Sequence, residues 1–210
     1  DGYSVTKEPM AVKRVIGVVP QEIALYEELT ALENLKFWGQ MYGLSGKQLS
    51  MRIDEVLEKI GLKERAKERI KTYSGGMKRR VNIGVGLLHK PKLLFMDEPT
   101  VGIDPQSRRA ILESVKELNQ SGMTILYTTH YMEEAQELSD RVGIIDYGEL
   151  IALGTQSELI SKVGEMDTLI LNLGENEDPA FLAKELRSMQ GVTQANPTDH
   201  QVAIVTPSGE

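Results

Sequence analysis

The chain has 210 residues, of which 40% are hydrophobic and 26% are charged, values typical of a globular domain. Its net charge of −7 argues against a general nucleic-acid-binding protein, which is usually basic, and the absence of cysteine excludes disulfides and thiolate metal sites. No apolar run approaches the roughly 18 residues of a membrane span, so we expect any role at a membrane to depend on a partner.

The first predicted strand is the β-branched run Val15–Val19, which a proline ends. Residues 22–72 follow, and their pattern indicates mainly helices. Thr30 and Glu33 have the spacing of a capping box, which predicts a helix start. Ser50 is the expected cap of a second helix, whose apolar positions lie on one face.

A serine and two glycines precede the next predicted helix, which we expect from about Met77 to His89. Ser74 suits an N-cap, while Gly75 and Gly76 let the backbone approach a ligand closely. The free N–H groups at a helix start suit an anion such as phosphate. The same residues also suit an ordinary capped helix in which Gly-Gly is only a turn, and the pattern alone leaves both interpretations open.

Two adjacent carboxylates follow the short apolar run Leu93–Met96, and Pro99 then stops the strand. Such a run indicates a strand buried on both faces of a mostly parallel sheet. Ligands bind beyond the carboxyl ends of such strands, so Asp97 and Glu98 are candidates for binding a metal or phosphate. The alternative is a core strand that ends in a solvated acidic turn.

His130 follows the next predicted strand, Met123–Tyr127, and could face the same crevice as the two carboxylates. A single histidine is more often structural, and that is the interpretation we adopt for His89 and His200. Between the two strands, Asp104 is expected to cap a helix that has a proline in its first turn.

Strands and helices alternate over residues 1–160, which predicts an α/β fold with a mostly parallel sheet. A helical subdomain is expected over about residues 22–80, and a hairpin over residues 142–153. Residues 161–210 are expected to form a small α+β appendage with a polar linker at 175–178. The predicted elements of this appendage are a strand at 169–173, a helix at 179–189 and a strand at 201–205.

The order of these motifs resembles that of the ATPase subunits of ATP-binding cassette (ABC) transporters, and the resemblance covers about residues 1–160. Gln21 matches the Q-loop, Leu93–Glu98 matches the Walker B strand with its glutamate, Gly102–Asp104 matches the D-loop, and His130 matches the switch histidine. Tyr73–Met77 matches the family signature Leu-Ser-Gly-Gly-Gln, from which it departs at the first and last positions. The resemblance implies a P-loop NTPase-like fold.

Two further stretches, Ser74–Arg80 and Thr129–Ala135, together with the C-terminal appendage, resemble the bacterial exporters of the daunorubicin-resistance type. This resemblance implies a multidrug or antibiotic exporter, with a peripheral ATPase at the cytoplasmic face of the membrane. It implies two partners, a transmembrane permease and a second ABC ATPase paired head to tail, and no nucleic acid. Residues 22–37 would dock the permease.

The same resemblance implies roles for individual residues, with ATP and Mg²⁺ as the bound groups. Asp97 would hold Mg²⁺ through water, and Gln21 would contact Mg²⁺ or the attacking water. Glu98 would orient or deprotonate that water, and His130 would steady the γ-phosphate. The remaining nucleotide-binding residues would be Ser74, Gly75, Gly76 and Asp104, of which the first three would contact ATP bound to the opposite subunit.

The phosphate-binding P-loop of the family, G-x-x-x-x-G-K-[ST], does not occur in the sequence. The one Gly-Lys pair, Gly46-Lys47, has Met41 and Gln48 where the motif requires glycine and a hydroxyl residue. Because the family places its P-loop before the Q-loop, we expect an N-terminally truncated cassette. We also expect this polypeptide alone to be poorly stable and not to hydrolyse ATP.

Two alternatives stay open. The chain could be a non-enzymatic module without a P-loop that pairs with another cassette and donates Ser74, Gly75 and Gly76 to it. It could also be a soluble ABC protein outside transport, although such proteins usually carry a second cassette or a long coiled coil, and neither is present in the sequence. A P-loop sequence in the natural protein would favour the exporter ATPase over the pairing module.

Overall fold

The computed structural model describes residues 2–163, 166–174, 178–198 and 200–207. By its internal contacts the chain divides into two compact units, residues 1–138 and 139–210, which are described separately below. The domain boundary predicted near residue 160 stays a prediction. None of the described helices is both long and apolar enough to cross a bilayer.

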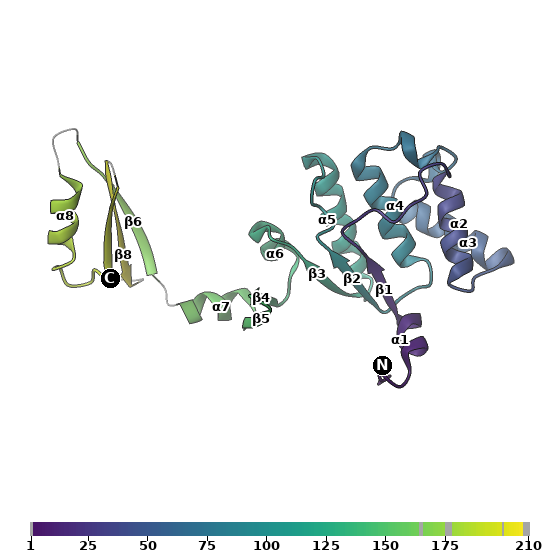
Figure 1. The fold of residues 1–210 in the computed structure, drawn as a ribbon, viewed down its shortest axis with the longest axis horizontal. Coiled ribbons are helices and arrows are strands. Elements are labelled where there is room, and N and C mark those ends of the chain that lie inside the picture. Colours follow the sequence, from purple (N-terminus) through teal and green to yellow (C-terminus); the bar gives the residue numbers. More distant parts are fainter. Residues whose placement is uncertain (1, 164–165, 175–177, 199, 208–210) are drawn as a thin grey trace. The chain divides into compact units, whose positions relative to one another are not determined.

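A three-stranded parallel sheet forms the centre of the first unit (Figure 1). Its strands are β1 (Ile16–Val19), β2 (Leu93–Asp97) and β3 (Thr124–Thr128), in the order β1-β2-β3. The register places Ile16 opposite Leu93 and Asp97 opposite Thr128, so the carboxyl ends of all three strands share one edge. The predicted α/β fold with a parallel sheet is therefore confirmed.

Helices connect these strands and carry most of the core. Their bounds are α1 (Pro9–Val15), α2 (Ala31–Met41), α3 (Gly46–Lys59), α4 (Gly75–Leu87), α5 (Pro105–Gln120) and α6 (Met132–Leu138), with the short 3₁₀ turns η1 (Lys63–Arg65) and η2 (Ile70–Thr72). Figure 1 shows α2 and α3 beside α4. Leu35, Ile70 and Leu94 are fully buried in the resulting core.

Three of the predicted helix caps are present and one is wrong. Thr30 and Glu33 form the expected capping box, and the Ser74 and Asp104 side chains cap α4 and α5. Ser50 does not begin a helix, because α3 starts at Gly46 after the extended residue Ser45. The Ser50 hydroxyl lies inside α3 and contacts the Gly46 carbonyl at 3.5 Å, a bond that an interior helical serine can make.

The sheet is less enclosed than the apolar pattern of β2 suggests. Leu94 and Met96 are buried, whereas the alternate residues Leu93 and Phe95 are only half-buried. Their neighbours on the same face, Val18 and Leu126, are 55% and 47% exposed. Successive residues of a strand point to opposite faces, so in the described part of the chain one face of the sheet packs and the other is partly open to solvent.

Gly17 brings β1 unusually close to α4, and this contact predicts a large packing effect. A Cβ atom at Gly17 would lie 2.4 Å from the Gly86 carbonyl oxygen and 2.8 Å from Leu94 Cδ1. Because a backbone atom cannot rotate away, we expect Gly17→Ala to lower the free energy of unfolding of the full natural protein by about 2–3 kcal/mol. Urea unfolding measures this loss. Val18→Ala, at the neighbouring exposed position, should cost less, and an equal cost for both variants would contradict the prediction.

The second unit contains a hairpin, β4 (Val142–Asp146) and β5 (Glu149–Gly154), which turns as predicted at Tyr147 and Gly148. Helix α7 (Gln156–Val163) follows it. A separate antiparallel sheet has the order β6-β8-β7, with β6 (Met166–Asn172), β7 (Gln194–Thr198) and β8 (Gln201–Pro207). Helix α8 (Pro179–Leu186) packs on this sheet through a small core of Ala183, Ala195, Val202 and Ile204.

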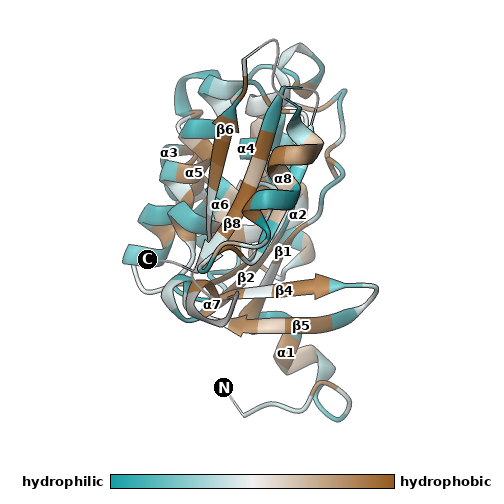
Figure 2. Cartoon of the chain, turned by 90° about the vertical axis from the view of Figure 1, so that its left-hand side faces the viewer, coloured by the Kyte–Doolittle hydropathy of each residue, from teal (hydrophilic) through white to brown (hydrophobic). Residues whose placement is uncertain are grey.

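Several details of this unit differ from the sequence expectation. Helix α7 and strand β7 were not predicted, and α8 ends at Leu186 rather than Met189. Of the polar linker 175–178, residues 175–177 lie outside the described part, while the Asp178 side chain caps α8 by accepting from the Ala180 N–H at 2.9 Å. Figure 2 shows hydrophobic residues along β4, β5 and β6, and many of these are exposed, among them Ile145 and Ile170.

Candidate active site

The end of β2 turns sharply, and Thr128 of the adjacent strand fixes the turn. Asp97 is the last residue of β2, and Glu98 has a φ angle of 41°, which is uncommon for a residue other than glycine. The Thr128 hydroxyl donates to Asp97 Oδ1 at 2.6 Å and accepts from the Glu98 N–H at 3.0 Å. One threonine thus holds both the Asp97 carboxylate and the Glu98 backbone at the strand end.

The Glu98 carboxylate lies between two side chains that follow the neighbouring strands. Gln21 Nε2 donates to Glu98 Oε2 at 3.1 Å, and His130 Nδ1 lies 3.0 Å from Glu98 Oε1. Gln21 comes two residues after β1, and His130 comes two residues after β3. The structure thus brings together three of the predicted site residues at the carboxyl edge of the parallel sheet, where ligands of such sheets bind. The Glu98 side chain is 28% exposed, so this group is accessible from solvent.

The predicted signature residues form a second group, packed against the start of α5. Ser74 Oγ accepts from the Met77 N–H at 3.2 Å and caps α4. A Cβ atom at Gly76 would lie only 2.2 Å from Ser107, whose own N–H donates to the Asp104 carboxylate at 2.9 Å. This hydrogen bond from the Ser107 backbone holds the pKa of Asp104 below its usual value.

Helix α4 also anchors the backbone around Gln21 through two residues that the sequence analysis did not single out. The Arg79 guanidinium, which is 3% exposed, donates to the carbonyls of Pro20 and Gln21. Asn82, which is also buried, donates to the Pro20 carbonyl at 3.3 Å and accepts from the Ala24 N–H at 3.3 Å. Burial lowers the pKa of Arg79 from its very high ordinary value. The helix that begins at the signature residues therefore fixes the start of the Gln21 loop.

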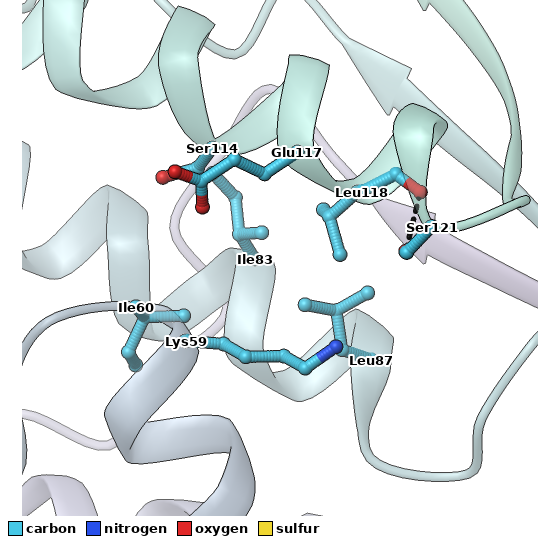
Figure 3. A pocket seen from close by; sticks show the side chains of 8 residues that line it. All are labelled: Lys59, Ile60, Ile83, Leu87, Ser114, Glu117, Leu118 and Ser121. Carbon is cyan, nitrogen blue, oxygen red and sulfur yellow. Dashed lines mark hydrogen bonds between the residues drawn. The ribbon is translucent and has the colours of Figure 1, made fainter.

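A separate small cavity of about 140 Å³ lies between the end of α3, α4 and α5. Figure 3 shows its apolar wall, which includes Ile83, Leu87 and Leu118, and its polar side chains, which include Lys59 and Glu117. It shares no residue with the group around Glu98. His89, for which we expected a structural role, lies elsewhere, stacked on Tyr42 with its Nε2 atom 2.8 Å from the Ile16 carbonyl oxygen.

Comparison with known proteins shows the family of this chain. Residues 1–101 match the family model described as ABC transporter. A solved structure described as the ATP-binding subunit of an ABC transporter is 32% identical and superimposes with a TM-score of 0.66, covering 77% of this chain and 68% of that one. The chain therefore belongs to the ATP-binding proteins of the ABC transporter family, and the expected P-loop NTPase-like fold is confirmed.

Similar proteins of known function indicate the subgroup of the ABC transporter family. The linearmycin resistance ATP-binding protein of Bacillus subtilis (strain 168) is 56% identical over 203 residues, which cover 97% of this chain and 64% of that protein. The daunorubicin/doxorubicin resistance ATP-binding protein of Streptomyces peucetius is 40% identical over 209 residues, covering 98% and 63%. These relatives confirm the predicted likeness to daunorubicin-resistance exporters. The chain spans less than two thirds of the length of either relative.

Proposed function

We propose that this chain is part of the ATP-hydrolysing subunit of an exporter that removes antibiotics or similar drugs, and that it works on a separate membrane permease at the cytoplasmic face. The observation that carries the proposal is the convergence of Gln21, Glu98 and His130 from three strand ends, in a chain of the ABC transporter family. The names of the relatives, which are resistance ATP-binding proteins, support the export of drugs.

In this proposal Asp97 and Gln21 hold Mg²⁺, partly through water. No cluster of three or more acidic, histidine or cysteine side chains that could hold a metal occurs among the described residues. Mg²⁺ is typically bound by one or two carboxylates together with substrate phosphates, so the single Asp97 carboxylate suits it without a preformed cluster of acidic residues. Bound Mg²⁺-ATP would supply the phosphoanhydride bond that is broken and the metal that neutralises its charge.

Glu98 then acts on the attacking water. Its carboxylate contacts both Gln21 and His130, and these two contacts fix the directions of its oxygens. A carboxylate held in this way can orient a water molecule and accept its proton. His130, which is half-exposed beside Glu98, would steady the transferring phosphoryl group.

The start of α4 would act on a second subunit. Ser74 and Gly75 lie exposed at the start of this 13-residue helix, with Gly76 buried behind them, and the positive end of the helix suits the γ-phosphate of ATP bound to a head-to-tail partner. Asp104, next to this turn, would lie at the same interface and contribute to nucleotide binding.

Hydrolysis in this proposal needs a phosphate-binding loop that residues 1–210 do not contain. We expect the 210-residue chain alone to show no magnesium-dependent ATP hydrolysis, because it lacks the lysine and backbone N–H groups that hold the β- and γ-phosphates. A phosphate-release assay on the chain, compared with the full natural protein, measures this. Turnover by the chain alone that Glu98→Gln abolishes would contradict the expectation.

A second candidate is a module that only pairs with another cassette and donates Ser74, Gly75 and Gly76 to it. Drug resistance in cells separates the two. The full natural protein and its permease would be expressed in a drug-sensitive strain, with Glu98 intact or replaced by glutamine. A hydrolysing subunit loses resistance on this replacement, whereas a pairing module keeps it. Copurification with a permease would also separate the exporter from a soluble ABC protein outside transport.

A further inference from the structure

We propose that Glu134, on α6, is a positioning residue that fixes His130 against Glu98. The inference rests on the proposed function, because it assigns Glu134 a part in the same hydrolysis. The Glu134 side chain is only 1% exposed, although it is a carboxylate on a short surface helix. Burying a charge costs free energy unless hydrogen bonds and an opposite charge compensate it, so the partners of Glu134 are informative.

Four donors surround this carboxylate. Oε1 accepts from the Thr100 hydroxyl and from Arg108 Nε, each at 2.7 Å, and Oε2 accepts from the Tyr127 and Thr129 hydroxyls, each at 2.9 Å. Burial alone would raise the pKa of Glu134, but these four hydrogen bonds outweigh it and lower the pKa below its usual value. Glu134 is therefore a charged and fully hydrogen-bonded centre.

Two of the four donors, Thr129 and Arg108, connect Glu134 to the residues that flank His130. The Thr129 hydroxyl donates to Glu134 and also accepts from the Tyr131 N–H at 3.0 Å, which closes the turn around His130. The Arg108 guanidinium, held by Glu134, lies 4.2 Å from the centre of the Tyr131 ring. The centres of the Tyr131 and His130 rings are in turn 4.2 Å apart. The histidine is thus held from both sides through one carboxylate.

A third donor, Thr100, connects the same centre to the turn of Glu98, because it lies two residues after Glu98. The fourth donor, Tyr127, lies inside β3 and belongs to neither turn. Glu134 therefore ties together the two turns whose relative position sets the 3.0 Å contact between His130 and Glu98. A centre needed only for stability would not have to join these turns, since packed apolar residues often stabilise a core as well as a buried ion pair.

Replacing Glu134 with glutamine keeps the shape of the side chain and disturbs the pattern of donors. The new amide oxygen can still accept from Thr100 and Arg108, but the amide nitrogen would face the Tyr127 and Thr129 hydroxyls, which then lose their acceptor. In the full natural protein we expect kcat for ATP hydrolysis to fall roughly tenfold to a hundredfold, with KM for ATP unchanged. Glu134→Ala should fall further, so that glutamine gives partial rescue.

Two matched variants test whether the effect of Glu134 on hydrolysis acts through the turn of His130. Thr129→Val removes a donor to Glu134 on the turn of His130, and Tyr127→Phe removes a donor to the same oxygen away from that turn. We expect Thr129→Val to lower kcat and Tyr127→Phe to keep most of it. Equal losses for the two variants, or an unchanged kcat for a folded Glu134→Gln variant, would overturn the inference.

A second readout does not depend on hydrolysis. The chain has three histidines, His89, His130 and His200, and NMR of their imidazole rings follows each one separately. Glu134→Gln should shift the His130 signals and leave those of His89 and His200 in place. Unchanged His130 signals would overturn the inference, even if the wild-type protein hydrolyses no ATP. Failure of hydrolysis in the wild type would instead refute the proposed function.

Discussion

Replacing Glu98 with glutamine in the full natural protein is expected to lower the rate of ATP hydrolysis about a thousandfold and to leave ATP binding nearly unchanged. The glutamine side chain has the same size and can still contact Gln21 and His130, which hold Glu98 at 3.1 Å and 3.0 Å. It cannot accept a proton from water, so the chemical step slows while the ground-state contacts persist.

Two measurements check this expectation on the same sample. Steady-state phosphate release gives kcat, and titration with a fluorescent ATP analogue in the presence of Mg²⁺ gives the dissociation constant. Glu113→Gln is the matched control, because Glu113 is an exposed glutamate on α5 that pairs with the surface residue Arg109. We expect that variant to hydrolyse ATP normally. A Glu98→Gln protein with wild-type kcat would show that Glu98 is not the base that acts on the attacking water.

The position of the Glu98 group was predictable because it follows from topology alone. Once the sheet is parallel and its strands are adjacent, the residues after β1, β2 and β3 must meet at one edge. Helix caps were predictable for a similar reason, since Thr30, Ser74 and Asp104 each bond to a backbone group within three residues. The error at Ser50 arose because a cap and an exposed helical serine look alike when Ser45 offers a second start.

Contacts between distant residues were not predictable in this way. Arg79 is 58 residues from Gln21 in the sequence, and Glu134 is 34 residues from Thr100, so no local sequence pattern indicates either contact. Strand β7 was missed because it contains Pro197, which usually argues against a strand. Among the described strands β7 stands at the edge of its sheet, beside β8, and a proline is tolerated at such an edge. Helix α1 was also not predicted, although Pro9 at its start is a residue that is common in the first turn of a helix.

Replacing Gly76 is also expected to have a large effect, because the signature turn packs against α5 at Gly76 without space for a side chain. A Cβ atom there would lie 2.2 Å from both Cβ and Oγ of Ser107. We expect Gly76→Ala to push the starts of α4 and α5 apart, to lower the free energy of unfolding by about 1–3 kcal/mol and to reduce ATP hydrolysis about a hundredfold. Urea unfolding and phosphate release measure the two effects in the full natural protein.

The double variant Gly76→Ala, Ser107→Gly separates packing from ligand contact. Glycine at Ser107 removes both atoms that the new methyl group meets, although glycine inside α5 itself costs about 1 kcal/mol, which Ser107→Gly alone calibrates. After that correction we expect stability to recover and hydrolysis to stay low, since the signature backbone is proposed to approach a phosphate closely. Gly75→Ala is the complementary control, because its nearest neighbour is Ile103 Cδ1 at 3.8 Å, an ordinary contact. It should keep stability and still lose hydrolysis. Recovery of hydrolysis in the double variant would instead mean that Gly76 serves helix packing alone and that the phosphate contact lies with Ser74 and Gly75.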